Sequence, residues 1–408
     1  MTTTHTTLLD EARGLLDDTV ALRRRIHRHP EIGLTLPRTQ QTVLEALDGL
    51  GLKTRTGQKT TSVVATLDGG RPGRTMLLRA DMDALPLKED TSLSFASEVD
   101  GAMHACGHDT HVAMLVGAAR MLAARRATLP GRVVFMFQPG EEGYHGAKVM
   151  IEEGLLEESK PDAAFGLHVG ARHPAGVIAT RGGAMLASGD TFQILVRGDG
   201  GHASAPHDCL DPIPIACEIV QAFQTLVTRR VNAFDPAVVT VAKIEAGTTR
   251  NIIPETASLL GTIRTVSEKT RNNVLEGVKR VAEGVAAAHG AKVEVNLIRG
   301  YPVTVNHDAF ADRVVRVATE LLGPEHVQAM ATPIMGSEDF SYVLQRVTGA
   351  FAFLGTKPVE GPAPPNHSNR MIVNESALPS GIAMHVAVAL DFLNGGPRNG
   401  PPYPPGRS

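Results

Sequence analysis

The stretch TMLLRADMD, residues 75–83, places a short apolar run directly before two carboxylates. Comparable apolar runs recur along the first half of the chain and alternate with helical patterns, which is typical of an α/β sheet. These runs are SVVATL at 62–67, VVFMFQ at 133–138 and AAFGLHV at 163–169. Apolar residues at helical spacing over 8–28 and 38–50 predict surface helices ahead of the sheet.

The pattern changes at about residue 185. Segments then follow in the order strand, helix, strand, strand, helix, strand, from TFQILVRG at 191–198 to KVEVNLIRG at 292–300. This order predicts a compact α+β insert of ferredoxin-like type over residues 185–300.

Helix and strand patterns of the first kind resume after the insert, at 307–323, 350–355 and 377–394. We therefore expect a discontinuous α/β domain, residues 1–184 and 301–394, that the insert interrupts. The Gly- and Pro-rich tail, residues 395–408, is predicted to be disordered.

Composition narrows the possible partners. A chain of 408 residues exceeds what one hydrophobic core usually supports, in agreement with two domains. The formal net charge is −3 with Lys and Arg scattered, so neither nucleic acid nor an anionic membrane is expected as a partner. Three cysteines are too few for a secreted disulfide framework, and no segment approaches a membrane span. These features indicate a cytoplasmic protein that acts on a small molecule.

The reactive side chains gather where the predicted strands end. Asp81 and Asp83 follow the run at 75–80, and Glu141 and Glu142 follow the run at 133–138. Further candidates stand at equivalent places: His168 closes its apolar run, His367 follows 350–355, and Cys106, His108 and Asp109 precede a helical pattern. Because ligands bind at the carboxyl ends of strands in open α/β sheets, we expect these segments to meet in one crevice.

The ligand chemistry of this set favours a metal. Cys thiolate, imidazole nitrogen and carboxylate oxygen together suit Zn²⁺, Mn²⁺ or Co²⁺ better than Mg²⁺, which prefers oxygen ligands. One glycine separates Cys106 from His108, and its small size leaves room for both side chains to approach one centre.

Glu141 and Glu142 form a second informative pair. In a loop, neighbouring side chains diverge, so one carboxylate can bind the metal while the other acts as general base on a water whose pKa the metal lowers. This arrangement is suited to the hydrolysis of an amide.

Each cluster alone also has a simpler explanation. HDTH at 108–111 can be a helix start capped by Asp109, the two glutamates can be a solvated turn, and Cys106 can be a small buried residue. Four clusters with compatible chemistry at equivalent sheet positions favour a functional site. Three other candidates are expected to be structural or to support the ligands: His104, His111 and Tyr144.

Two other functions are compatible with the same residues. Cys106 could be the nucleophile of a thiol amidase, activated by a nearby histidine. The protein could also be a metal-dependent binding protein without turnover, although such a protein has no need for Glu141 beside the metal.

Eight motifs follow one another in an order that is typical of one enzyme family. They are RRRIHRHPEIGL (23–34), LLRADMDALPL (77–87), MHACGHDTHVAMLVGAA (103–119), FQPGEEGYHGAKVMIEEG (137–154), GLHV (166–169), GGHASAPH (200–207), RNIIPE (250–255) and GSEDFS (336–341). They resemble the metal-dependent N-acyl-amino-acid amidohydrolases: hippurate hydrolases, bacterial aminoacylases and plant auxin-conjugate hydrolases, which are related to carboxypeptidase G and the dinuclear zinc aminopeptidases. The resemblance spans roughly residues 20–390.

The resemblance implies a catalytic domain with two divalent ions, Mn²⁺ or Zn²⁺, with Co²⁺ and Ni²⁺ as alternatives. The implied ligands are Cys106, His108, Glu142, His168 and His367. Cys106 takes the bridging position that Asp holds in the wider superfamily, and Glu141 matches the general base. Asp83 and Asp109 would support the ligands, and Asp81 stands where many relatives have a metal-binding His.

The resemblance also gives the insert a role as lid and dimerisation domain, in a homodimer or a tetramer. His202 matches a histidine that stabilises the tetrahedral oxyanion, in many relatives from the partner subunit. Asn251, and more weakly Arg250, match residues that hold the substrate. The implied substrate is an N-acyl amino acid whose acyl group is not specified, with short dipeptides as the alternative.

Overall fold

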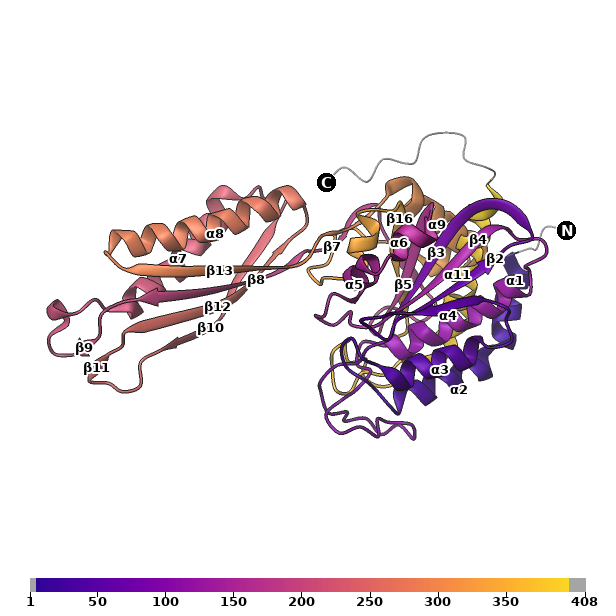
Figure 1. The fold of residues 1–408 in the computed structure, drawn as a ribbon, viewed down its shortest axis with the longest axis horizontal. Helices are drawn as coiled ribbons and strands as arrows, with labels where there is room; N and C mark the ends of the chain where they lie inside the picture. Colours follow the sequence, from indigo (N-terminus) through magenta and orange to yellow (C-terminus); the bar gives the residue numbers. More distant parts are fainter. Residues whose placement is uncertain (1–4, 396–408) are drawn as a thin grey trace. The chain divides into compact units, whose positions relative to one another are not determined.

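A computed structural model describes residues 5–395, which fold into two compact units (Figure 1). The first unit contains the chain up to Gly183, Val305–Thr332 and the part from Asp339 on; the second contains Ala184–Thr304 and Pro333–Glu338. The predicted fold class, an α/β unit with a smaller inserted α+β unit, is confirmed. The predicted disordered tail lies outside the described residues except for Gly395.

The first unit is built on an eight-stranded sheet of order β1-β2-β4-β3-β5-β16-β6-β15. Its strands are β1 Lys53–Thr56, β2 Val63–Asp68, β3 Arg71–Asp81, β4 Pro130–Gln138, β5 Ala163–Gly170, β6 Ile178–Thr180, β15 Val327–Ala329 and β16 Gly349–Gly355. β4, β3, β5 and β16 run parallel, with Leu78 opposite both Phe135 and Phe165. Parallel strands buried on both faces are continuously apolar, which explains the uniform runs in the sequence. The carboxyl ends of these four strands therefore share one edge.

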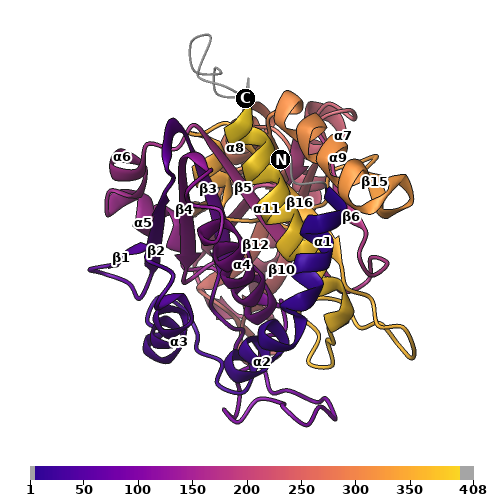
Figure 2. The ribbon, with the colours of Figure 1, turned by 90° about the vertical axis from the view of Figure 1, so that its right-hand side faces the viewer.

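Helices cover both faces of this sheet. They are α1 His5–Gly14, α2 Leu16–His27, α3 Pro37–Leu47, α4 His108–Ala123, α5 Gly146–Glu152, α6 Leu155–Ser159, α9 Asp308–Leu322, α10 Ser341–Leu344 and α11 Leu378–Asn394, with 3₁₀ turns at Pro324–His326 and Glu375–Ala377. α4 and α11 pack against β3 and β5, and α5 and α6 lie on the other side of the sheet (Figure 2). A Cβ on Gly117 of α4 would come within 2.8 Å of Ile382 in α11, so glycine permits this close packing.

Two expectations need correction. The helical pattern over 8–28 is interrupted at Leu15, because Gly14 ends α1 and glycine is a poor helix former. The segment Glu375–Asn394 is long and apolar enough to cross a membrane, although no such segment was expected. Of its apolar window, 78% is buried inside the structure, and α11 packs against α1, α4 and α9 as a core helix.

The second unit has a four-stranded antiparallel sheet of order β10-β12-β8-β13 with α7 and α8 on one face. Its elements are β8 Gly189–Arg197, α7 Pro212–Arg230, β10 Ala237–Ala246, β12 Thr256–Thr265, α8 Glu268–Ala288 and β13 Lys292–Tyr301, with the 3₁₀ turn Pro206–Asp208 and the short pair β9 Gly201–His202 and β11 Ile252–Ile253. Phe192, Phe223 and Ile263 form part of its separate core. Where the chain passes between the units, β7 Gly183–Leu186 and β14 Thr304–Asn306 form a two-stranded sheet.

A buried ion pair crosses the core of the second unit. Arg271 of α8 donates to both carboxylate oxygens of Asp190 on β8, at 2.9 and 2.7 Å, and to the carbonyl of Gly300 at 3.0 Å. The charges are almost fully shielded from water, so each needs the other.

We expect Asp190→Asn to lower the free energy of unfolding by about 1.5–3 kcal/mol, because it removes the buried carboxylate that accepts two hydrogen bonds from Arg271 and leaves this charge with Glu268 alone, at 3.1 Å. Glu294→Gln is the matched control, since Glu294 pairs with Arg197 on the exposed side of the sheet and should cost about 1 kcal/mol or less. Urea unfolding followed by circular dichroism measures both. Equal losses in the two variants would contradict this account.

Candidate metal centre

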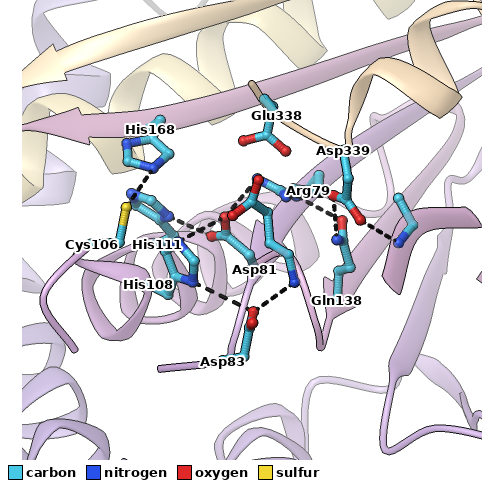
Figure 3. A network of polar contacts seen from close by, with 12 residues as sticks. Arg79, Asp81, Asp83, Cys106, His108, His111, Gln138, His168, Glu338 and Asp339 are labelled. Atoms are coloured by element: carbon cyan, nitrogen blue, oxygen red, sulfur yellow. Dashed lines mark hydrogen bonds and ion pairs between the residues drawn. The ribbon is translucent and has the colours of Figure 1, made fainter. Parts of the chain in front are cut away.

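The side chains at the ends of β3 and β5 and in the loops that follow β4 and β16 lie together at one edge of the first unit. Figure 3 shows Asp81, Asp83, Cys106, His108, His111 and His168 of this group. Their ligand atoms form overlapping groups within 4.8 Å of one another: Cys106 with Glu142 and His367, His108 with Glu141 and Glu142, and Asp81 with His108, His111 and His168. The five residues predicted as metal ligands therefore form one continuous cluster, with Glu141 beside it.

Cys106, two residues before α4 begins, lies next to His168 of β5. The Cys106 Sγ lies 3.3 Å from His168 Nε2, while His168 Nδ1 lies 2.8 Å from the carbonyl oxygen of Val169. Because a carbonyl only accepts, Nδ1 carries the proton and Nε2 keeps its lone pair toward the thiol. Gly107 makes this approach possible: its φ is +83°, and a Cβ would come within 2.4 Å of Val169 Cγ2.

Glu142 joins the remaining ligands. Its Oε1 lies 3.2 Å from His367 Nε2 and 3.9 Å from His108 Nε2. Oε1 and both ring nitrogens of His108 are buried without a hydrogen-bond partner among the described residues. Buried polar atoms are nearly always satisfied, so these three atoms mark a place where a further group is needed.

Asp83 holds the backbone of the loop that carries Glu141 and Glu142. Its Oδ1 accepts from the Glu141 amide at 2.9 Å, and its Oδ2 accepts from the Glu142 amide at 3.0 Å. The same carboxylate lies 3.6 Å from His108 Nδ1, while Nε2 of that ring lies 3.3 Å from Asp81 Oδ2 and 3.9 Å from Glu142 Oε1. One carboxylate thus fixes the backbone from which both glutamate side chains diverge.

Asp81 and His111 make contacts with other groups of the protein. Arg79 pairs with Asp81 at 2.8 Å, and His111 Nδ1 contacts the other Asp81 oxygen at 2.5 Å. His111 Nε2 accepts from the Val169 amide at 2.8 Å, so both ring nitrogens are occupied and the proton lies on Nδ1. The expectation that His111 is structural or supports the ligands agrees with these contacts.

The network around Arg79 was not predicted from the sequence. The guanidinium donates to Gln138 at 2.9 Å and pairs with Asp339 at 3.3 Å, and Asp339 accepts from the Ala147 amide at 2.9 Å (Figure 3). A signal was present: an arginine inside an otherwise apolar strand must find a buried acidic partner.

Asp109 faces away from the ligands. Its Oδ2 accepts from Arg23 at 2.9 Å and lies 2.8 Å from His27 Nδ1, both on α2. These contacts outweigh the effect of burial and hold the pKa of Asp109 well below its ordinary range. Asp109 therefore anchors the first turn of α4, and with it the backbone of His108.

The histidine pKa values describe the charge of the cluster. Burial lowers the pKa of His168 well below its ordinary range, so its ring is neutral, as a ligand must be. Contacts with Cys106 and Glu142 raise the pKa of His367 to about 10. Burial opposes protonation of His108, yet Asp81 and Asp83 raise its pKa well above the ordinary range. The carboxylates around these rings thus favour positive charge in the cluster, which a divalent cation supplies when it displaces these protons. The residues fit such a cation.

The predicted lid residues belong to the second unit. His202 and Asn251 are brought together there, because β9 pairs with β11 and places His202 opposite Ile252. The Ser204 amide donates to His202 Nδ1 at 3.1 Å, so the proton of the neutral ring lies on Nε2. Arg250 precedes Asn251 in an exposed turn. Their part in the site stays a prediction.

Known proteins are similar to this chain over nearly its whole length. A thermostable carboxypeptidase of Saccharolobus solfataricus is 39% identical over 95% of this chain and 98% of its own length. A hippurate hydrolase of Campylobacter jejuni is 35% identical over 95% of this chain and 99% of its own. A crystal structure from Bacillus subtilis, described as a dinuclear metal binding peptidase, has a TM-score of 0.81 at 33% identity and covers 94% of this chain and 99% of that one.

The expected resemblance is therefore confirmed at the level of the family. The model of peptidase family M20/M25/M40 matches residues 77–391, which include every residue of the metal cluster and most of both units. The chain belongs to this family of metal-dependent hydrolases.

Proposed function

We propose that this protein hydrolyses the amide bond of N-acyl amino acids to a carboxylate and a free amino acid. One observation carries the proposal: the buried carboxylate of Glu141 lies beside Glu142 and His108, with their ligand atoms within 4.8 Å. A second carboxylate next to a ligand set serves proton transfer, which binding alone does not require. The similarity to a hippurate hydrolase supports this substrate class.

The proposed cofactor is a pair of divalent ions held by Cys106, His108, Glu142, His168 and His367. A mixed thiolate, imidazole and carboxylate set favours Mn²⁺ or Zn²⁺, followed by Co²⁺ or Ni²⁺, over Mg²⁺. When bound, the ions would polarise the scissile carbonyl and lower the pKa of the attacking water.

The protein side chains then have separate tasks. Glu141 accepts a proton from the water on a carboxylate oxygen and passes it to the nitrogen of the leaving amine. Asp83 holds the amides of Glu141 and Glu142, so the two side chains keep different directions. His202, with its proton on Nε2, donates to the oxyanion, while Asn251 and Arg250 hold the substrate.

Dipeptides are the second candidate substrate, because carboxypeptidases are among the similar proteins. One distance supports a thiol amidase: His168 Nε2 lies 3.3 Å from the Cys106 sulfur, where it could accept the proton of the thiol. Metal removal separates it from the proposed reaction.

The proposed location is the cytoplasm, since Cys106, Cys209 and Cys217 are all free thiols, as a reducing compartment favours. Recovery of the native protein in a membrane or secreted fraction would contradict this location.

Chelation should abolish hydrolysis, and Mn²⁺ or Zn²⁺ should restore it, because the ligand cluster cannot polarise a carbonyl without the ions. The assay is a panel of acetyl, benzoyl, indole-acetyl and long-chain acyl amino acids together with dipeptides. Full activity in verified metal-free protein that is lost on alkylation would establish the thiol mechanism instead. Saturable binding without product would establish a binding protein.

We expect Glu141→Gln to lower kcat by roughly 10²–10⁴-fold at near-normal metal content, because it removes only the proton carrier. Glu142→Gln is the matched control, since the same change one residue later should reduce metal content itself. Elemental analysis and steady-state kinetics distinguish the two effects. Retained turnover in Glu141→Gln would refute the assigned role.

The second unit is proposed as the lid and as the subunit contact of a homodimer or tetramer. Its sheet exposes large apolar side chains that a partner could cover, namely Val238, Ile244, Leu260 and Ile298. A histidine on such a unit can reach the site of its own subunit or that of the partner.

His202→Ala should lower kcat by roughly 10²–10³-fold with metals still bound, because one oxyanion donor is lost. Mixing subunits of His202→Ala with those of Glu141→Gln should then restore activity if His202 acts on the partner subunit. Sedimentation of the mixture checks assembly. A monomer in solution would contradict the proposed contact, and unchanged kcat in His202→Ala would contradict the role of this residue.

A further inference from the structure

Asn366 touches two segments that carry proposed metal ligands, the Cys106 loop and the end of β5, and itself precedes a third ligand, His367. Its side-chain oxygen accepts from the Ala171 amide at 3.1 Å, and its side-chain nitrogen donates to the carbonyls of Cys106 at 3.2 Å and Val169 at 3.0 Å. The three partners fix the orientation of the amide, because an amide N–H must meet oxygen and the carbonyls must meet nitrogen. The group is thereby saturated by contacts within the first unit.

Each of these contacts is made to a proposed metal ligand or to a residue close to one in the chain. The Asn366 nitrogen donates to the backbone carbonyl of Cys106 and also lies 4.0 Å from the Cys106 sulfur. The Val169 carbonyl is the same acceptor that fixes the proton of His168 on Nδ1. His367 follows directly in the chain, and its amide donates to the Ala105 carbonyl at 2.7 Å.

The backbone at His367 requires such support. Its φ is +69°, a left-handed conformation that a non-glycine residue adopts only where its surroundings enforce it. Without the bonds on either side, this peptide could relax and turn the imidazole away from Glu142, which it now meets at 3.2 Å.

We propose that Asn366 is a positioning residue that sets the geometry of Cys106, His168 and His367 as one unit. The inference rests on the proposed metal centre and adds a residue to it. Groups that hold ligands in place typically change metal affinity by roughly 10–100-fold when they are lost.

Asn366→Asp is the sharpest variant. Its carboxylate still accepts from Ala171, but it cannot donate and faces two carbonyl oxygens in place of hydrogen bonds. Asn366→Ala removes all the bonds without this repulsion and serves where Asn366→Asp fails to fold. Asn369→Asp is the matched control, because Asn369 is an exposed residue three positions along the same loop.

The probe is Co²⁺, added to the full chain after chelation, since a cobalt–thiolate bond absorbs in the near ultraviolet. We expect roughly 10–100-fold weaker Co²⁺ binding in Asn366→Asp, a smaller loss in Asn366→Ala, and a shifted thiolate band per bound cobalt in both. Asn369→Asp should match the wild type. Circular dichroism of the metal-free proteins separates these effects from loss of folding, which would leave the band per bound cobalt unchanged.

Wild-type affinity and an unaltered band in both Asn366 variants would overturn the inference while leaving the proposed function intact. A wild-type protein without any thiolate band would overturn Cys106 as a ligand, and this inference with it. The proposed hydrolysis is judged independently by turnover on the acyl amino acid panel.

Discussion

The ion pair between Arg79 and Asp81 is the interaction on which the candidate centre depends. Both side chains are completely buried and lie 2.8 Å apart at the end of β3. Arg79 extends the pair to Gln138 and Asp339, and thereby to the loops that follow β4 and precede α10. Loss of one partner from such a pair costs about 3–5 kcal/mol, because the remaining charge stays buried. The sheet edge is thus fixed by a buried charge network, and its member Asp81 also lies within 4.8 Å of the ligand atoms of His108, His111 and His168.

The histidines of this edge show how contacts decide the use of a residue type. His111 has both ring nitrogens occupied, by Asp81 and by the Val169 amide, and so holds the structure together. His168 has one nitrogen fixed by a carbonyl and the other directed at a thiol. His108 has neither nitrogen in a hydrogen bond within residues 5–395. These contacts explain why His111 holds the structure together, but free nitrogens alone do not identify a ligand, since both ring nitrogens of buried His104 also lack a hydrogen bond within residues 5–395.

The sequence was sufficient for the strands and for the clusters that follow them. The runs at β3, β4 and β5 are apolar because parallel strands are buried on both faces, and this local property is visible without a structure. The reactive residues could be grouped because strand ends meet at one edge.

What the sequence could not give depends on contacts between distant segments. Asn366 meets Cys106 across 260 positions and Val169 across 197, and a lone asparagine carries no pattern that indicates either contact. The return of Pro333–Glu338 to the second unit depends likewise on packing.

Asp81 shows why a departure from a family pattern need not weaken a site. Many relatives are expected to carry a metal-binding histidine at this position, but here one carboxylate oxygen pairs with Arg79 and the other contacts His111. A histidine in its place would leave Arg79 with Asp339 alone as its acid and His111 without its acceptor, both in a buried layer where such losses are costly. The acid at 81 and the arginine at 79 therefore belong together, and Cys106 and Glu142 on the neighbouring loops are the proposed counter-charges of a cation. The softer thiolate among these donors is what shifts the expected metal toward a borderline ion.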